Sequence, residues 1–396
     1  MRFVQISDFH LDSKTKTSQL GMPVAKAEQR QREIRNVLVK VCDLVKSENI
    51  ELLLIPGDLF DYESCKLDTI NFIIEQFSRI SPTPVVICPG NHDYCSPSSL
   101  YNSAYLAQRG QQTWPPHVHI VKTPEWISFT LKELNNVAIT SCVHTQNYGI
   151  EQRRLAIPLP KRQGMLNLLV FHGSRLNYVP EGKKVTLPFT DEELLSQGFD
   201  YAAIGHYHSY SEITDAKGIV RGAYSGCPAG RDLSETGEKY ILVGNLDAKQ
   251  EVTLERVRVD KRCIYSVEVS CTGLTHSEAV LNKVAQKIKE KTTNKDDIVF
   301  IKLTGLMPPD FDIDVPPYFM ASDYFHLKID PSGVKPDYDL NSLSRETDST
   351  QGKFVNRMLE MEKQAKDEHE RRIYHNALLY GLDSLIQKKV RARYED

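Results

Sequence analysis

The chain has 396 residues and a formal net charge of −3, with 40% hydrophobic and 26% charged residues. This length predicts two or three domains, and the composition is ordinary for a soluble globular protein. No apolar run reaches the roughly 20 residues that cross a bilayer, and the small net charge neither supports nor excludes nucleic acid as a partner.

The start of the chain and its cysteines both favour the cytoplasm. The chain opens with a strand-like run and shows no secretory signal pattern. Its eight cysteines are scattered and form no CxxC pair. They are therefore expected to be reduced thiols, neither a disulfide framework nor a zinc site.

Five short apolar runs in the first half have the length and β-branched content of buried strands. They are Phe3–Ile6, Leu52–Ile55, Val85–Ile87, Leu168–Phe171 and Ala202–Ile204. Apolar residues at helical spacing predict helices over 26–47 and 68–80, and further strands are expected at 137–143 and 240–243. We therefore expect a mixed α/β (α+β) fold over residues 1–250, with a β-sandwich flanked by helices.

The later part of the chain has a different pattern. Residues 252–259 alternate apolar and polar side chains and predict a half-buried strand that leaves the first domain. A small α+β module over residues 260–330 is expected to contain strands and a helix at 263–269, 277–291, 298–304 and 324–329. Residues 331–350 are rich in Pro, Gly, Ser and Asp and are interpreted as a linker. Residues 351–396 predict apolar helices, which either pack on the protein's own body or dock on a partner.

A polar motif follows each of the five strand-like runs. In chain order these are Asp8-Phe9-His10, Gly57-Asp58-Leu59-Phe60-Asp61, Gly90-Asn91-His92-Asp93, His172-Gly173 and Gly205-His206-Tyr207-His208. Because strand ends of an open α/β sheet meet at one rim, we expect these side chains to converge there. A single strand-end histidine is usually a hydrogen-bonded structural residue, but carboxylates, a carboxamide and imidazoles from five strands suit a pair of divalent metals.

The five motifs in this order resemble those of the calcineurin-like metallophosphoesterases. The resemblance implies a hydrolase with two metal ions, one held by Asp8, His10 and His208. The other would be held by Asn91, His172 and His206. Asp58, which stands alone at its strand end, is the candidate for the bridging ligand. This mixture of nitrogen and oxygen ligands suits Mn²⁺, although iron or zinc fits the same shell.

His92 is assigned to proton transfer. It neighbours Asn91, but a turn at the strand end would aim its side chain elsewhere, and an imidazolium can protonate a leaving alkoxide near neutral pH. Asp61 is expected to accept a hydrogen bond from His92 and to raise the pKa of that imidazole, as an aspartate at this place does in related phosphatases. A turn-capping role is the alternative for Asp61.

Finer details separate this chain from the Ser/Thr protein phosphatases. It has Tyr62-Glu63 and Cys88-Pro89 where those enzymes usually have Arg-Gly. Its stretches Ile6–Ser13 and Tyr224–Arg231 resemble instead the SbcD-like DNA repair exonucleases, and most closely their YhaO-like branch. This resemblance covers the first 250 residues. Archaeal and eukaryotic relatives carry a histidine in place of Asp61, so the roles of that histidine are not transferred here.

The resemblance implies a manganese-dependent DNA nuclease with exonuclease and endonuclease activity, acting in DNA repair or DNA end processing. It also implies a capping role for the module at 260–330 and an SMC-like coiled-coil ATPase partner bound through the C-terminal helices. Whether the chain forms a homodimer stays open. Two other hypotheses remain: a phosphodiesterase for nucleotides or other small phosphate esters, and a non-catalytic scaffold that recruits a partner.

Overall fold

The computed structural model describes residues 1–13, 20–143, 152–178, 185–247, 251–311, 313–316, 319, 323–388 and 390. The chain divides into two compact units, Met1–Cys263 and Ile264–Asp396, which are described separately. None of the described helices is long and apolar enough to cross a membrane.

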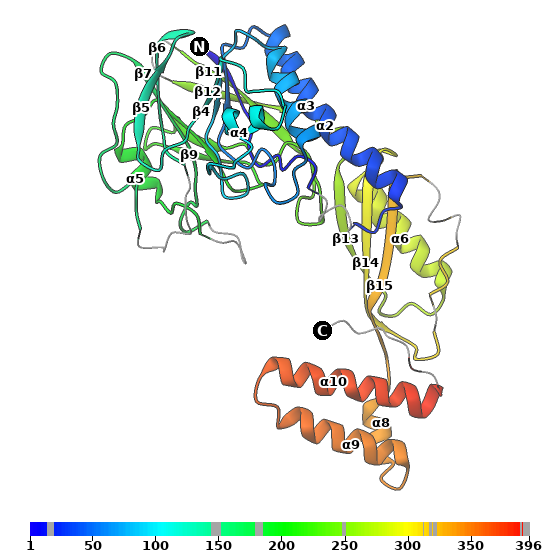
Figure 1. Ribbon diagram of the computed structural model, residues 1–396. Coiled ribbons are helices and arrows are strands. Elements are labelled where there is room, and N and C mark those ends of the chain that lie inside the picture. The colour runs from blue at the N-terminus through cyan, green and yellow to red at the C-terminus, as the bar shows by residue number, and fades with distance from the viewer. Residues whose placement is uncertain are drawn as a thin grey trace. The chain divides into compact units, whose positions relative to one another are not determined.

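The first unit is built on a 12-stranded sheet that curls over on itself (Figure 1). The strand order is β4-β3-β2-β1-β11-β12-β10-β8-β7-β6-β5, with β9 paired to β10. The strands are β1 Arg2–Gln5, β2 Leu52–Ile55, β3 Val85–Ile87, β4 Val118–Ile120, β5 Ile127–Leu131, β6 Leu134–Ser141, β7 Leu166–His172, β8 Tyr201–Gly205, β9 Ser211–Thr214, β10 Val220–Tyr224, β11 Tyr240–Leu246 and β12 Val252–Arg258. The mixed α/β fold expected from the sequence is confirmed.

The two halves of the sheet face each other as a sandwich. They are joined where β10 meets β12, at the pair Val220–Val252. Side chains from both halves share one buried core, in which Phe3 and Leu54 of the first half contact the cluster that includes Val170 and Ala203 of the second. The interior of the sandwich is therefore mainly apolar, as expected for strands that alternate apolar and polar side chains.

Helices cover the outer face of the first half of the sheet (Figure 1). The helix α2 (Val24–Ser47) buries Ile34, Val37, Leu38 and Val41, which recur at helical spacing and form an apolar stripe. The helix α3 (Leu67–Ser78) adds a similar stripe, and the short α4 (Ser103–Gln108) follows β3. On the second half, α5 (Asp191–Ser196) contributes Leu194 to a separate outer core.

Strand direction places the site. The strands β1 to β4 run parallel to one another, and so do β6, β7, β8 and β10. The buried Gln5 ties the two halves behind the first motif, since its Nε2 donates to the carbonyls of Ile204 (3.3 Å) and Ala223 (2.9 Å). The carboxyl ends of strands from both halves therefore reach one rim.

The strand at 252–259 does not leave the first unit, so that expectation was wrong. The strand β12 pairs with β11 along its whole length, from Tyr240–Arg258 to Leu246–Val252, and lies in the middle of the sheet order. Alternation of side chains identifies a half-buried strand, but it does not reveal which strand offers the hydrogen bonds. Here the antiparallel pairing with β11 keeps β12 in the sheet of the first unit.

The second unit contains a parallel sheet with one helix packed on it. Its strands are β13 (Ile264–Ser270), β14 (Ile298–Met307) and β15 (His326–Pro336), in that order. The helix α6 (Ser277–Lys291) buries Val280, Val284 and Ile288 in the core that these strands form.

Part of the expected linker at 331–350 has regular structure. The strand β15 continues to Pro336, because the ten-residue β14 supplies partners and a register shift between Lys302 and Thr304 accommodates the chain. The helix α8 (Leu340–Arg345) follows, capped by the side chain of Asp339. The Pro, Gly and Asp content therefore marks the irregularity and the cap, not an extended linker.

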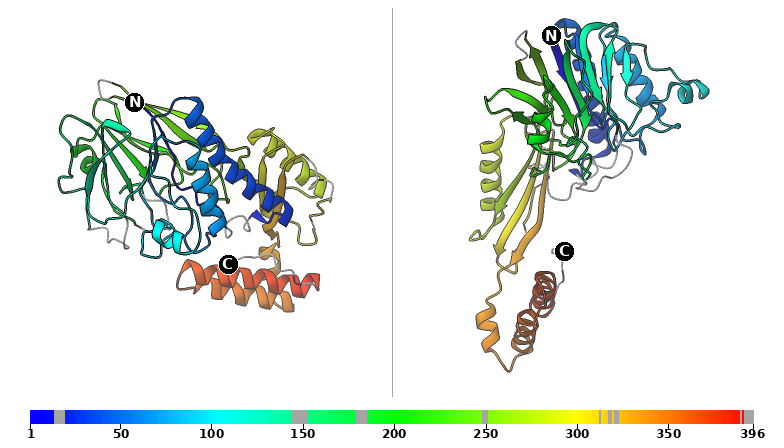
Figure 2. Two further views of the ribbon diagram at one scale, coloured as in Figure 1. Left: turned by 45° about the horizontal axis from the view of Figure 1, so that its top comes forward. Right: turned by 90° about the vertical axis from the view of Figure 1, so that its left-hand side faces the viewer.

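The C-terminal helices form a pair. The helices α9 (Thr350–Lys363) and α10 (Glu368–Leu382) run side by side in both figures, and a π-helical turn, Asp383–Gln387, follows (Figure 2). Val355, Leu378 and Leu382 are buried between them together with Tyr338. The apolar stripes are thus satisfied in part by the pair itself.

Candidate metal centre

All five motifs lie at strand ends on the rim described above. The predicted ligands follow β1, β2, β3 and β8 or, for His172, end β7. Four of them, Asp8, His10, Asp58 and His206, have positive φ angles of 52°, 45°, 54° and 113°. Non-glycine residues rarely adopt this backbone region, and such strain persists only where the surrounding structure holds it. The backbone is therefore shaped to present these side chains.

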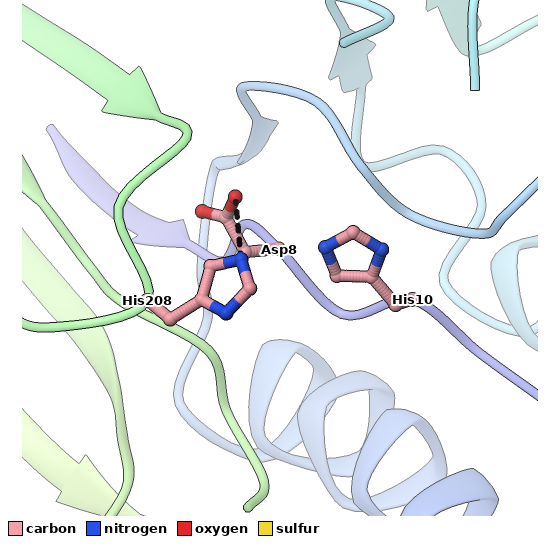
Figure 3. Close-up of side chains that lie close together, drawn as sticks. All are labelled: Asp8, His10 and His208. Carbon is pink, nitrogen blue, oxygen red and sulfur yellow. Dashed lines mark ion pairs between the residues drawn. The ribbon is translucent and has the colours of Figure 1, made fainter. Parts of the chain in front are cut away.

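The side chains of Asp8, His10 and His208 form the first cluster (Figure 3). Their ligand atoms all lie within 4.8 Å of one another, and His208 Nε2 is 4.0 Å from Asp8 Oδ1. Asp8 is fully buried, and this burial raises its pKa to about 6. Hydrogen bonds from Ser7 Oγ (2.6 Å) and the His206 N–H (3.0 Å) orient the carboxylate. A bound cation would stabilise its ionised form.

The carboxylate of Asp58 lies between two groups of imidazoles. Its Oδ2 is 3.6 Å from His10 Nε2 and 3.4 Å from His172 Nε2, while its Oδ1 accepts a hydrogen bond from the His92 N–H at 2.9 Å. Burial opposes ionisation of Asp58, but the neighbouring imidazoles of His172 and His10 hold its pKa below the usual range. One oxygen that faces ligands of both clusters is the position required of a bridging ligand.

The second cluster is centred on Nε2 of His172. This atom lies 3.0 Å from Asn91 Oδ1 and 3.2 Å from His206 Nδ1, and Nδ1 of the same ring is 3.0 Å from the carbonyl oxygen of Pro56. When Nδ1–H donates to that carbonyl, the neutral ring presents a lone pair at Nε2 towards the Asp58 carboxylate. Acceptors that face one another in this way fit a cation between them.

His10 provides a direct test of whether the site fits a metal. Burial lowers its pKa to about 3, so the ring is neutral, and its Nδ1 contacts Asp61. Its Nε2 is buried and has no hydrogen-bond partner among the described residues. An unpaired buried nitrogen is costly, yet a neutral imidazole nitrogen is a good ligand for a divalent metal. The residues present therefore fit the dinuclear metal site that this donor set suggests.

His92 and Asp61 form a pair next to the ligands. Nδ1 of His92 is 3.2 Å from Oδ1 of Asp61, and the His92 side chain is 51% exposed, unlike the buried ligands. The hydrogen bond from this imidazole to Asp61 raises the pKa of His92, as predicted. The sequence did not predict that the same Asp61 oxygen would also contact His10. This carboxylate contacts imidazoles on both sides, which favours the pairing role over the turn cap.

Two residues of the site were not singled out from the sequence. Oε1 of Glu235 lies 2.7 Å from Nδ1 of His208, and the buried Arg231 forms an ion pair with the same Glu235. Such a carboxylate fixes the tautomer of a ligating histidine. The available signal was three charged residues, Arg231, Asp232 and Glu235, at the end of a stretch rich in Gly, Ser and Ala, and it does not identify their partners.

Asp93, which belongs to the third motif but received no role from the sequence, is fully buried. Its carboxylate accepts hydrogen bonds from the N–H groups of Gly90 (2.6 Å), Asp58 (3.1 Å) and Leu59 (2.8 Å) and from the hydroxyl of Tyr101 (2.6 Å). It thereby holds the loops that carry Asp58 and Asn91 together.

Comparison with known proteins agrees with this geometry. The family model of calcineurin-like phosphoesterases matches residues 1–210. An uncharacterized metallophosphoesterase of Bacillus subtilis, YhaO, is 28% identical over 254 residues, which cover 61% of this chain and 57% of that protein. The DNA double-strand break repair protein Mre11 of Sulfolobus acidocaldarius is 22% identical over 344 residues, covering 83% and 82%.

One component of the nuclease SbcCD from Bacillus subtilis is 24% identical over 286 residues, covering 65% of this chain and 69% of that protein. The chain thus spans little more than half the length of YhaO, but a larger share of the other two relatives. Because the family model covers more than half of the chain and the ligand sets of both clusters lie within or at the end of that match, the chain belongs to the calcineurin-like phosphoesterases, a family of metal-dependent hydrolases.

Proposed function

We propose that this chain is a manganese-dependent DNA nuclease, with exonuclease and endonuclease activity, that serves as the nuclease subunit of an SbcCD-like complex in DNA repair or DNA end processing. The observation that carries the proposal is the single Asp58 oxygen shared by two ligand clusters, with the half-exposed His92 beside it. Relatives named for DNA break repair and for a nuclease support DNA as the substrate class.

The chemistry divides between the metals and the chain. Two bound divalent cations, for which Mn²⁺ suits the mixed ligands, would clamp a phosphoryl group and stabilise its attacking and leaving oxygens. His92 then donates a proton from its imidazolium to the leaving oxygen of the phosphodiester. Asp61 holds His92 in the orientation and protonation state that this transfer needs. The apolar sandwich and the hydrogen bonds of Asp93 keep the ligands in place.

The partner of this chain is proposed to be an SMC-like coiled-coil ATPase, bound through α9 and α10. The helix pair buries part of its apolar surface internally, but Ile373 of α10 and Ile386 of the π-helical turn after it remain 44% and 38% exposed. We expect Ile373→Glu with Ile386→Glu to abolish co-purification with the ATPase while the fold persists. The variant Arg357→Glu, on the exposed charged surface of α9, is the control.

The test of the activity uses purified protein with manganese, and then with EDTA, on end-labelled single- and double-stranded DNA. Wild type is expected to cut DNA only with manganese. His92→Asn should bind two metals but cut about 10²- to 10⁴-fold more slowly, the usual loss when a proton donor is removed. Rapid hydrolysis of small diesters, with DNA neither cut nor competing, would instead identify a phosphodiesterase for small esters. A wild type without metal binding would indicate a scaffold.

A further inference from the structure

Two tyrosines accompany the His92–Asp61 pair. Tyr62 directly follows Asp61, and Tyr94 lies two residues after His92. The N–H of Tyr62 donates to the carbonyl oxygen of His92 at 2.8 Å, so the two loops are tied together at this point. The aromatic pair is therefore held at a defined place relative to the group that we propose to protonate the leaving oxygen.

The two rings contact each other and differ in burial. Their centroids are 4.8 Å apart with an angle of 42° between the ring planes. Tyr62 packs against the buried core and its hydroxyl donates to the carbonyl of Ser98 at 3.3 Å, so the inner ring is supported from within the fold. Tyr94 is 38% exposed. The outer ring thus offers aromatic surface on a rigid support.

Such exposure is uncommon in this unit. Among its described residues, the aromatic side chains with a large exposed fraction are Tyr94 and Tyr178. The other large apolar side chains that are exposed in this unit are aliphatic. A single exposed apolar side chain needs no explanation in general. An exposed ring supported by a second ring, beside a phosphoester site, is the arrangement on which nucleobases stack.

The chain that leaves Tyr94 lines a polar cavity. This cavity has a volume of about 310 Å³ and is lined in part by Ser96, Asn102 and Lys122. In the described part of the chain, no carboxylate forms an ion pair with Lys122. A lone ammonium with a hydroxyl and an amide suits a phosphate group, and it distinguishes this surface from one that binds an apolar protein segment.

We propose that Tyr62 and Tyr94 form a stacking platform for an unpaired nucleobase next to the scissile phosphate, and that the Lys122 cavity takes a neighbouring phosphate of the same strand. The inference rests on the proposed function and specifies its substrate as a single strand, or an end whose last bases are unpaired. Stacking does not depend on hydrogen bonds of the base, so the platform accepts all four bases.

The experiment is a double-mutant cycle between protein and DNA. Cleavage of a single-stranded oligonucleotide is compared with cleavage of the same strand that carries an abasic residue on either side of the scissile bond. We expect Tyr94→Ala to raise KM by about 5- to 150-fold on the intact strand, since one stacked base contributes about 1–3 kcal/mol. On one of the two abasic strands, wild type and Tyr94→Ala should have the same KM. The substitution should change kcat little on any strand, and Tyr94→Phe should behave as wild type.

One control and one further test variant complete the experiment. Ile127→Ala removes a side chain with the same 38% exposure from the edge strand β5, and it should change no constant. Lys122→Gln should weaken binding and lower its dependence on salt, as expected for a lost phosphate contact. Equal losses on intact and abasic strands, or no loss for Tyr94→Ala, would overturn the platform. The platform would also be overturned if the protein formed a dimer that Tyr94→Ala dissociates while KM stays unchanged.

The test also separates the two proposals. If neither wild type nor any variant cuts DNA, the proposed function fails. Quenching of 2-aminopurine fluorescence in a bound mononucleotide then tests by itself whether the tyrosines stack on a base. Quenching by wild type that Tyr94→Ala abolishes would retain the platform for a small nucleotide substrate. Absence of quenching by wild type would overturn it.

Discussion

The imidazole of His208 donates its Nδ1 hydrogen to Oε1 of Glu235 over 2.7 Å. Arg231, which is 2% exposed, forms an ion pair with Glu235. Burial opposes ionisation of Glu235, but Arg231 and the His208 imidazole together keep the pKa of this carboxyl well below its usual value. The ionised Glu235 fixes the tautomer of His208, so that Nε2 presents its lone pair on the side of Asp8. The first cluster therefore depends on a pair of residues outside the predicted ligand set.

We expect Glu235→Gln to weaken binding of one of the two manganese ions by about 10- to 100-fold, the usual cost of losing a carboxylate behind a ligating histidine. The second ion should bind with nearly unchanged affinity, since Glu235 supports His208 of the first cluster and not the ligands around His172. Titration of the metal-free protein, followed by electron paramagnetic resonance or calorimetry, measures both affinities without reference to any substrate.

The control for Glu235→Gln is Glu33→Gln. Glu33 also accepts hydrogen bonds from an arginine, Arg262 (2.6 Å), but this pair joins α2 to the segment after β12, and among the described residues neither side chain is hydrogen-bonded to a predicted ligand. Both variants should unfold at lower temperature, and only Glu235→Gln should lose metal affinity. Equal metal affinity in the two variants would contradict the role of Glu235.

Asp61→Asn should affect both proton transfer and metal binding. Asp61 raises the pKa of His92, so its replacement lowers that pKa, and the imidazolium is then lost at a lower pH. The alkaline limb of the kcat profile is expected to move to lower pH. Because Asp61 also contacts His10, one metal should bind more weakly as well.

The matched variant for this measurement is Asp68→Asn, which alters an exposed carboxylate on α3. Its pH profile and metal affinities should equal those of wild type. An Asp61→Asn protein with an unmoved alkaline limb and two tight metals would remove Asp61 from both roles.

The sequence predicted the parts of the fold whose signal is local. The strands β2 and β3 and the helix α6 have the predicted bounds, residue for residue, because each is an uninterrupted apolar run or a clear helical stripe. The short strands β4, β9 and β10 were not predicted. They are only partly buried or contain small residues, and they exist because a neighbouring strand supplies hydrogen bonds.

In the candidate site, too, features with a local sequence signal were predicted and features that depend on tertiary contacts were not. Its motifs are recognisable in the sequence because each is contiguous and follows a strand. The contacts that support them are not, since Asp61 and His10 are 51 residues apart and Glu235 and His208 are 27 apart. Such contacts depend on tertiary packing. A charged residue with a distant partner gives no local pattern.

Gly90→Ala should displace the shared ligand. A Cβ at this position would lie 2.3 Å from Oδ1 of Asp58 and 2.9 Å from its backbone nitrogen, closer than carbon and these atoms can approach. The carboxylate must move, so we expect weaker binding of both metals and a large loss of hydrolysis. Gly110→Ala is the control, because its added Cβ meets nothing within 4 Å and only its positive φ of 66° adds backbone strain. Retention of both metals in Gly90→Ala would argue against Asp58 as the bridge.

Glu33 provides a prediction about stability and pH that involves no metal. Burial alone would raise its pKa, but hydrogen bonds from Arg262 and Gln29 hold that pKa below the usual value. A carboxyl with a depressed pKa in the folded state stabilises the fold above its unfolded pKa, and this contribution is lost as the pH falls through the folded value. At pH 7, Glu33→Gln should cost about 1–3 kcal/mol, as for hydrogen bonds to charged groups. The difference in Tm between wild type and variant, measured in EDTA, should therefore be largest near neutral pH and shrink below the usual pKa of a glutamate. A constant difference across this range would mean that the charge on Glu33 does not contribute to stability.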